Sequence, residues 1–220
     1  MVDTVVLDID GTLVDSNYHH TLAWARAFRA VGRDVPLWKI HRSIGMGGDR
    51  LVSRFVGADA DGRLTHRVKE VWAQEIDGLL GETILLPSAA ELLRRLGERP
   101  VKVVLASSGK PDHVRRALEL LGEKNAADSA IDQVTSSGDA ATKPAPDLID
   151  KALDEVGGST AVVIGDSVWD AEAAKRAATR MVGVLTGGFG ADELRAAGAE
   201  RVFDDLTELL QVLDEVLVVE

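Results

Sequence analysis

The chain of 220 residues contains no cysteine, so disulfide bonds and thiolate chemistry are excluded. No stretch approaches the ~18 consecutive apolar residues that a membrane-spanning helix needs. The N-terminus also lacks the basic segment followed by an apolar run that marks a secretory signal. These absences favour a soluble, globular, cytoplasmic protein that has no membrane partner.

Positive charge is also in short supply. The sequence has 25 Lys and Arg residues against 36 Asp and Glu residues, a net charge of −11, which argues against nucleic acid as a partner. The charge is uneven, because residues 16–81 carry ten Lys and Arg against seven Asp and Glu, whereas the rest of the chain is strongly acidic. This asymmetry indicates two modules that face each other, with anions attracted to the positive one.

Short apolar runs rich in β-branched residues recur along the chain, at 4–7, 101–106, 161–164 and 181–185. Runs that are apolar throughout, rather than alternating, are typical of parallel strands covered on both faces of a sheet. Helical patterns lie between them, at 89–96, 112–121, 147–156 and 168–178. The alternation predicts an α/β fold, with a Rossmann-like, open and mostly parallel sheet.

One long segment breaks this alternation. In residues 16–81, Trp24, Phe28 and Val31 repeat at helical spacing, further helical patterns follow, and no strand is evident. We therefore expect an all-helical domain of residues 16–81 inserted into a core domain made of residues 1–15 and 82–220. Its hinges are predicted at residues 14–17 and in the glycine- and proline-containing segment 78–87.

Two carboxylates stand at the end of the first predicted strand. Asp8 and Asp10 are two residues apart, so the period of a strand places both side chains on the same side. Like charges that close repel by roughly 4 kcal/mol at 4 Å in partly screened surroundings. A chain tolerates this repulsion where a cation binds or where one carboxyl group transfers protons. The alternative is a plain acidic strand end that turns into a glycine loop.

Polar residues follow the other strands as well, and in open α/β sheets ligands bind beyond the carboxyl ends of the strands. Ser107 and Ser108 follow the second predicted strand, where backbone N–H groups and a helix N-terminus can bind an anion. Lys143 lies in a loop stiffened by two prolines. Asp166 and Asp170 follow the third strand, one helical turn apart. A turn, a surface lysine and helix caps are the structural alternatives.

The order of these motifs resembles that of the haloacid dehalogenase (HAD) superfamily of phosphohydrolases. The matching residues are Asp8-x-Asp10-Gly11-Thr12, Ser107, Lys143 and Gly165-Asp166-x-x-x-Asp170. The resemblance extends from the first strand to the last core helices, and the helical insertion resembles a C1-type cap. It implies phosphoryl transfer through a covalent aspartyl-phosphate.

The resemblance also implies roles for the acidic residues. Asp8 would attack phosphorus, and Asp10 would protonate the leaving oxygen and later deprotonate the hydrolytic water. Mg²⁺, a hard cation that prefers oxygen ligands, would be held by Asp8, the main-chain carbonyl of Asp10, and Asp166. Asp170 would support this metal site from behind. An acid/base aspartate at position 10 favours phosphate chemistry over the carbon chemistry of the dehalogenases.

The remaining motif residues would bind the phosphoryl group. Ser107, the backbone N–H of Ser108, and Lys143 would bind its oxygens as charge shifts during transfer. Lys110 follows the second motif, as in phosphoglycolate phosphatases and sugar-phosphate mutases whose lysine approaches the substrate phosphate.

Two residues of the insertion are candidates for substrate contacts. Arg50 ends a glycine-containing segment, residues 44–50, that resembles the substrate-specificity loop of C1-cap phosphatases, and its guanidinium could bind a carboxylate or a sugar hydroxyl. His20 stands where related enzymes carry a histidine that faces the cleft. A salt bridge within the cap and packing at the domain junction are the respective alternatives.

Three functions are compatible with these residues. The leading one is a Mg²⁺-dependent phosphatase, a monomer or weak homodimer, acting on a small phosphorylated metabolite such as phosphoglycolate or a sugar phosphate. The second is a β-phosphoglucomutase-like mutase, which passes the phosphoryl group to a second sugar hydroxyl instead of water. The third is a non-catalytic phosphate- and metal-binding regulator, disfavoured because a pure binder has no need of the acid/base residue Asp10.

Overall fold

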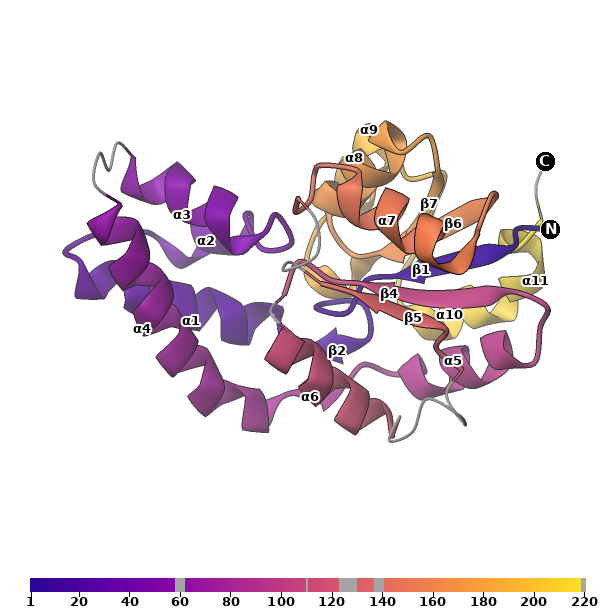
Figure 1. Ribbon diagram of the computed structural model, residues 1–220, viewed down its shortest axis with the longest axis horizontal. Helices are drawn as coiled ribbons and strands as arrows, with labels where there is room; N and C mark the ends of the chain where they lie inside the picture. The colour runs from indigo at the N-terminus through magenta and orange to yellow at the C-terminus, as the bar shows by residue number, and fades with distance from the viewer. Residues whose placement is uncertain (58–61, 110, 123–129, 137–140, 219–220) are drawn as a thin grey trace.

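A parallel sheet forms the centre of the protein. The computed structural model describes residues 1–57, 62–109, 111–122, 130–136 and 141–218 (Figure 1). Within these ranges six parallel strands pair in the order β5-β4-β1-β6-β7-β8. They are β1 (Thr4–Leu7), β4 (Lys102–Ala106), β5 (Gln133–Thr135), β6 (Ala161–Gly165), β7 (Arg180–Val184) and β8 (Arg201–Phe203). The predicted α/β fold with an open, parallel sheet is confirmed.

Helices cover both faces of this sheet, which explains why its central strands are apolar throughout. Val5 and Leu7 of β1 pack with α5, α6, α10 and α11, whereas Val6 points to the opposite face, toward α7, α8 and α9. The two helical layers are visible below and above the sheet in Figure 1. The helices are α5 (Ala89–Gly97), α6 (Pro111–Leu121), α7 (Asp147–Val156), α8 (Val168–Arg176), α9 (Ala191–Ala197), α10 (Leu206–Gln211) and α11 (Leu213–Val216).

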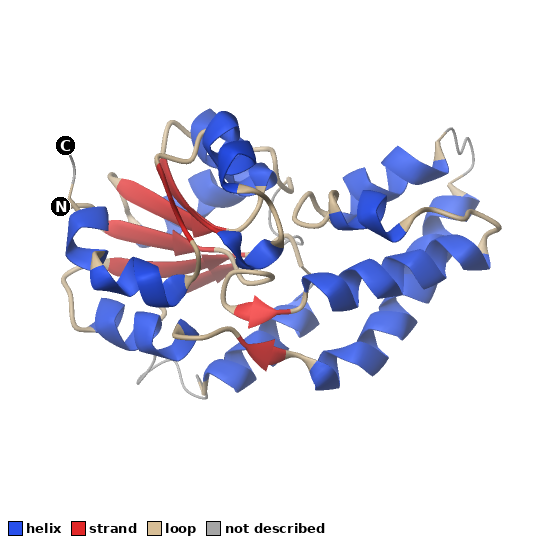
Figure 2. Cartoon of the chain, turned by 180° about the vertical axis from the view of Figure 1, so that it is seen from behind, coloured by secondary structure: helices blue, strands red, loops and turns tan. Residues whose placement is uncertain are grey.

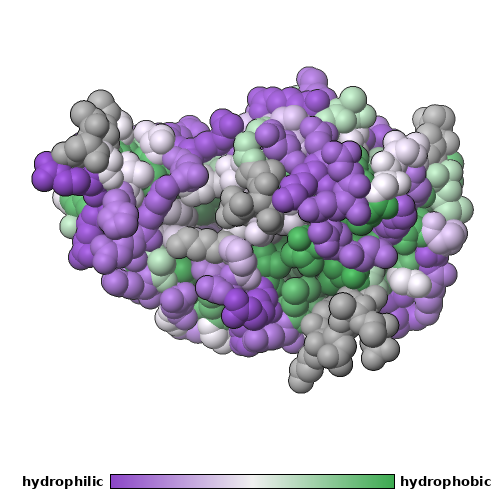
Figure 3. Space-filling view, in the orientation of Figure 1, coloured by the Kyte–Doolittle hydropathy of each residue, from purple (hydrophilic) through white to green (hydrophobic). Residues whose placement is uncertain are grey.

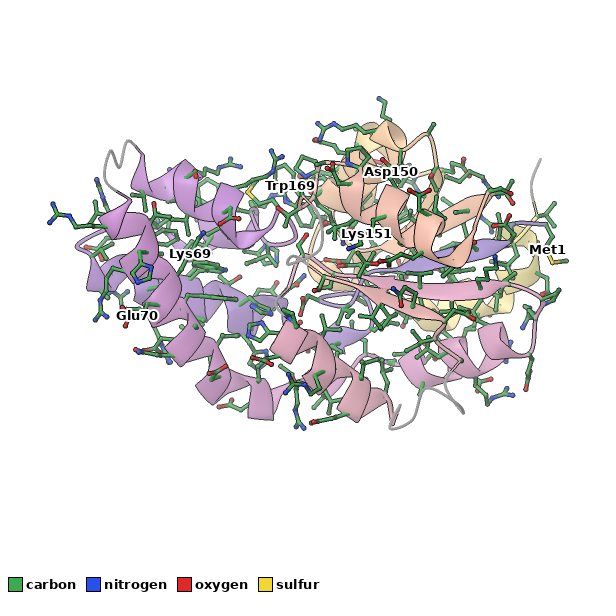
Figure 4. All side chains as sticks on the ribbon, in the orientation of Figure 1. Met1, Lys69, Glu70, Asp150, Lys151 and Trp169 are labelled. Carbon is green, nitrogen blue, oxygen red and sulfur yellow. The ribbon has the colours of Figure 1, made fainter. Side chains whose placement is uncertain are left out.

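A second group of helices lies beyond one end of the sheet (Figure 2). This helical group consists of α1 (Asn17–Ala30), α2 (Leu37–His41), α3 (Gly48–Val56), α4 (Arg63–Leu79) and the 3₁₀ turn η1 (Leu80–Glu82). It has an apolar cluster of its own, built around Trp24, Phe28 and Trp72. Trp169 of α8 packs against this cluster and against the sheet layer, at the junction seen in Figure 4. The expected helices are present, and the division into two domains at residues 16 and 81 stays a prediction.

The chain enters and leaves the helical group through two short strands, β2 (Val14–Asp15) and β3 (Ile84–Leu85). They pair antiparallel, with Val14 opposite Leu85, and lie in the two segments that the sequence identifies as hinges. The two segments that connect the sheet to the helical group are therefore hydrogen-bonded to each other before the helices begin.

On the face visible in Figure 3 most residues are hydrophilic, and hydrophobic residues gather in an area near the centre of the view. None of the described helices combines the length and apolar character needed to cross a bilayer.

The register of the central strands places the site. Leu7 of β1 lies beside Leu105 of β4 on one side and beside Ile164 of β6 on the other. The residues that follow these three strands therefore emerge next to one another, at the end of the sheet that faces the helical group.

We expect Asp3→Asn to weaken the attachment of β1 to the loop before β6. The Asp3 carboxylate accepts hydrogen bonds from the Ser159 hydroxyl (2.6 Å) and the Ser159 N–H (3.0 Å), among others. Burial raises the pKa of Asp3, but the bonds from Ser159, Thr4 and Thr160 lower it further, so the pKa lies well below its usual value. The variant should lose about 1 kcal/mol of unfolding free energy at pH 7, measured by urea denaturation.

The loss of unfolding free energy caused by Asp3→Asn should become smaller as the pH is lowered. A carboxyl group with a depressed pKa stabilises the fold above its unfolded pKa of about 3.9, and the contribution disappears as the pH falls toward the folded value. The difference between wild type and Asp3→Asn should therefore be smaller at pH 3 than at pH 7. Asp77→Asn, at an exposed position, serves as the control. An equal difference at both pH values would contradict this account.

Candidate active site

A tight turn after β1 folds the chain back over the end of the sheet. The Asp8 N–H continues the ladder by donating to the Ile164 carbonyl (3.0 Å), and the Gly11 N–H donates to the Val14 carbonyl (2.8 Å). Gly11 adopts a φ of +80°, and a Cβ there would lie 2.5 Å from a carboxylate oxygen of Asp166. Glycine is therefore required both for the turn and for the close approach to Asp166.

A buried lysine lies between two buried carboxylates at this end of the sheet. Lys143 Nζ forms ion pairs with Asp8 and, at 2.6 Å, with Asp170 Oδ1. The three side chains are at most 6% exposed. Burial lowers the pKa of Lys143, but the charges of Asp170 and Asp8 raise it further, so the pKa lies above its usual value and the ammonium stays charged. The lysine is thus paired with two carboxylates, as a buried charge must be.

Three acidic side chains converge beside this lysine. Asp8, Asp166 and Asp170 each offer an oxygen within 4.8 Å of the other two, and all three are buried. Burial and the neighbouring charges of Asp170 and Asp8 raise the pKa of Asp166 well above its usual value. Burial raises the pKa of Asp8 to about 7, although Lys143 opposes the shift. One ammonium therefore does not balance the cluster, whose all-oxygen donor set suits a hard divalent cation.

Asp166 is held from several sides. Thr12 Oγ1 donates to its Oδ1 (3.1 Å), and Asn17 Nδ2 donates to its Oδ2 (2.9 Å). The backbone of Gly187 lies so near that a Cβ there would come within 1.7 Å of Oδ2. Such a fixed carboxylate is prepared to bind a cation without rearrangement.

Asp170 has a structural duty as well. Together with Ser167 it forms a capping box at the start of α8, in which the Ser167 N–H donates to Asp170 Oδ2 (3.1 Å). The helix-cap alternative raised by the sequence therefore holds for Asp170, and its other oxygen still faces Lys143.

Asp10 is turned away from this cluster. Its Oδ1 accepts a hydrogen bond from Ser16 Oγ (2.5 Å) and lies 3.2 Å from His20 Nε2. Burial raises the pKa of Asp10, but His20 and Ser16 lower it further, so the pKa lies below its usual value. Asp8 thus faces the lysine and Asp10 faces the helical group, although the charge of Asp10 still contributes to the raised pKa of Asp8.

A cavity of about 60 Å³ opens between the end of the sheet and the helical group. Asp8, Asp10 and Ser108 line it from the sheet side. From the helical group it is lined by His20, Trp24, Ser43, Ile44, Gly45, Gly47, Gly48, Leu51 and Trp72. Trp24 and Trp72 stack at 4.6 Å between ring centroids, so the wall opposite the carboxylates is aromatic.

The structure brings most of the predicted residues together. Ser107 is buried, accepts a hydrogen bond from the Gly109 N–H (2.9 Å), and belongs to the loop that reaches Asp10. Ser108 and His20 line the cavity. Arg50 does not: it is exposed on α3 and absent from the cavity wall, so its substrate contact stays a prediction without support from this arrangement. Lys110 lies outside the described residues.

Three contacts of the site are not predicted from the sequence: those of Thr12 and Asn17 with Asp166, and that of Ser16 with Asp10. Small polar residues near a helix start are ordinarily interpreted as caps. The only available signal is their placement just after the acidic pair, which becomes informative once the Gly11 turn is known to fold the chain back.

Comparison with known proteins supports a shared architecture. A family model described as haloacid dehalogenase-like hydrolase matches residues 2–178. Validoxylamine A 7'-phosphate phosphatase of Streptomyces hygroscopicus subsp. limoneus is 30% identical, over 95% of this chain and 96% of its own. Phosphoglycolate phosphatase of Rhodospirillum rubrum is 31% identical, over 95% and 90% respectively. The crystal structure of a hydrolase from Pseudomonas syringae has a TM-score of 0.89 at 35% identity, covering 98% and 99%.

We expect Lys143→Ala to destabilise the fold by about 3–5 kcal/mol, because it leaves buried Asp8 and Asp170 without their cation. Urea denaturation in the presence of a chelator measures the effect. Lys175→Ala, which removes an exposed lysine of α8, is the control and should change stability by less than about 0.5 kcal/mol. Equal stabilities of the two variants would refute the charge balance described above.

Proposed function

The chain belongs to the haloacid dehalogenase-like hydrolase family, and on this basis we propose that it hydrolyses a small phosphorylated metabolite with Mg²⁺, through an aspartyl-phosphate on Asp8. It is an enzyme, a hydrolase of phosphoric monoesters with relatives named as phosphatases. One observation carries the proposal: a carboxylate that lines the cavity, Asp8, also belongs to a buried acidic cluster with a lysine beside it.

Asp8 is the proposed nucleophile. One of its oxygens would bond to phosphorus while the bond from phosphorus to the leaving oxygen breaks. Lys143, held against Asp8, offers the positive charge that an approaching phosphate dianion requires. Mg²⁺ would be bound by Asp8, Asp166 and the main-chain carbonyl of Asp10, with Asp170 in support, and would supply further charge compensation and orient the phosphoryl group.

Asp10 is the proposed proton carrier. Its carboxylate lines the cavity and is tied to Ser16 and His20 rather than to Lys143, so it is free of the ion pair that occupies Asp8. Because its pKa lies below the usual value, Asp10 would have to take up a proton before donating one to the leaving oxygen, and it would later accept one from the water that cleaves the aspartyl-phosphate.

The loop after β4 would bind the phosphoryl oxygens. Ser107 and the backbone N–H of Ser108 lie at this loop, and Ser108 lines the cavity. Donors fixed in advance at such a position stabilise the charge that develops during transfer.

The helical group would act as the cap that excludes water and selects the leaving group. We expect the substrate, a small phosphorylated metabolite such as phosphoglycolate or a sugar phosphate, to bind in the cavity between this group and the sheet. We propose that the enzyme is cytoplasmic and acts as a monomer or weak homodimer.

Asp8→Asn should lower Mg²⁺-dependent phosphate release from p-nitrophenyl phosphate by at least about 1,000-fold, because the amide cannot form the covalent intermediate. Phosphate release is measured with the purified variant after thermal unfolding has established that it is folded. Asp77→Asn, at an exposed position that does not line the cavity, should retain activity. Undiminished release by Asp8→Asn would overturn the mechanism.

A screen of phosphorylated metabolites for kcat/KM should identify at least one small monoester, such as phosphoglycolate or a sugar phosphate, that is hydrolysed faster than p-nitrophenyl phosphate. The reason is that binding of the natural leaving group contributes to transition-state stabilisation. β-Glucose 1-phosphate belongs in the screen, with the product analysed. Formation of glucose 6-phosphate instead of inorganic phosphate would identify a mutase.

A further inference from the structure

The first turn of α1 places a buried amide on the acidic cluster. Asn17 is 3% exposed, and its Nδ2 donates to Asp166 Oδ2 at 2.9 Å. The same nitrogen lies 3.4 Å from the Gly187 carbonyl. Asn17 begins the helical group, whereas Asp166 lies in the loop after β6 and Gly187 ends the 3₁₀ turn η2 (Leu185–Gly187) that follows β7.

Helix capping does not account for this side chain. Ser16 occupies the N-cap position, and no side chain caps the first turn of α1. The Asn17 side chain instead reaches out of its own helix. An asparagine in the first turn of a helix is thus used for a contact across the molecule.

We propose that Asn17 is a positioning residue for the metal site and that it links the seating of the helical group to metal binding. The inference rests on the proposed Mg²⁺-dependent function. Asp166 receives two donors, one on each oxygen: Thr12 Oγ1 from the turn after β1, and Asn17 Nδ2 from α1. Together they fix the orientation of this carboxylate, which is what a partner behind a metal ligand does.

The amide oxygen of Asn17, Oδ1, also supports a role at the metal site. It is buried and has no hydrogen-bond partner among the described residues. A buried amide oxygen needs a donor, and the carboxylates nearby offer none when ionised. Mg²⁺ usually keeps several water ligands, and such a water is a strong donor. Asn17 therefore holds the carboxylate of Asp166 with its Nδ2, and its Oδ1 is left to accept from a donor such as a metal-bound water.

The contact connects two parts of the protein that the hinge strands β2 and β3 would let move. His41 of α2 also contacts the loop after β7, with Nε2 2.9 Å from the Gly187 carbonyl. Asn17 lies where the predicted hinge meets α1, so a rotation of α1 relative to the sheet would shift its Nδ2 from Asp166. Metal binding and seating of the helical group are then thermodynamically linked, so each favours the other by the same factor.

Isothermal titration calorimetry with Mg²⁺ tests the positioning role, using wild type, Asn17→Ala, Asn17→Ser and Thr12→Val. Both Asn17 variants should bind Mg²⁺ about 10-fold more weakly, in line with the loss of a partner behind a metal ligand. Leu22→Ala, at a partly exposed position of α1, is the matched control and should bind like wild type. Asp166→Asn provides the reference for loss of a ligand.

Hydrogen exchange tests the link. Mg²⁺ should slow amide exchange in the first turns of α1 in wild type and in Thr12→Val, whose missing donor comes from the sheet side. It should not do so in the Asn17 variants. Unchanged Mg²⁺ affinity in a folded Asn17 variant overturns the inference. So does the absence of any Mg²⁺ effect on α1 exchange in wild type, a measurement that needs no variant to fold.

Failure of the inference is distinguishable from failure of the proposed function. Wild type that releases phosphate with Mg²⁺ while Asn17→Ala binds the ion normally refutes the inference alone. Wild type that neither binds Mg²⁺ nor releases phosphate refutes both.

Discussion

The buried Lys143 ammonium is the interaction on which the site depends. Asp8 and Asp170 come from different segments of the chain, and both are nearly inaccessible to water. Without a cation between them, burial would force one of the two carboxyl groups to take up a proton. With Lys143 in place, Asp8 lies against a positive charge. Asp166 then adds negative charge that the lysine does not offset, and this excess suits the acidic cluster to bind a divalent cation.

The sheet explains how residues so far apart meet. Because β4, β1 and β6 are parallel neighbours in register, the loops that follow them emerge at one end. The proximity of Asp8, Ser107 and Asp166 follows from that topology. The helical group then covers the same end, and its Asn17 and His20 contact Asp166 and Asp10. The carboxylate pair is thus divided between two environments, Asp8 with the lysine and Asp10 with the helices.

The sheet and motif residues were predictable because each leaves a local signal. The central strands are buried on both faces and are therefore apolar throughout, whereas the missed edge strands β5 and β8 have three residues each and include Gln133 and Arg201. The carboxylates and the lysine of the motifs also leave a local signal, because charged residues in loops next to apolar strands stand out in the sequence. The roles of Thr12, Ser16 and Asn17 were not predictable, since they depend on how the Gly11 turn folds back. Arg50 illustrates the opposite case: its segment resembles a specificity loop, but its side chain points to solvent in this arrangement.

The sheet side of the site and the wall formed by the helical group differ in their residues and in their proposed roles. Asp8, Asp10, Lys143 and Asp166 carry the proposed chemistry, and their surroundings are tightly constrained by ion pairs, capping hydrogen bonds and glycines with no room for a side chain. The opposite wall consists of Trp24, Trp72 and a glycine-containing loop on a group of helices joined to the sheet through β2 and β3. Rigid preorganisation is needed where charge develops, whereas admission of a substrate needs a wall that can move. The Asn17–Asp166 hydrogen bond joins the helical group to the acidic cluster, so by our proposal it would couple the position of that group to metal binding.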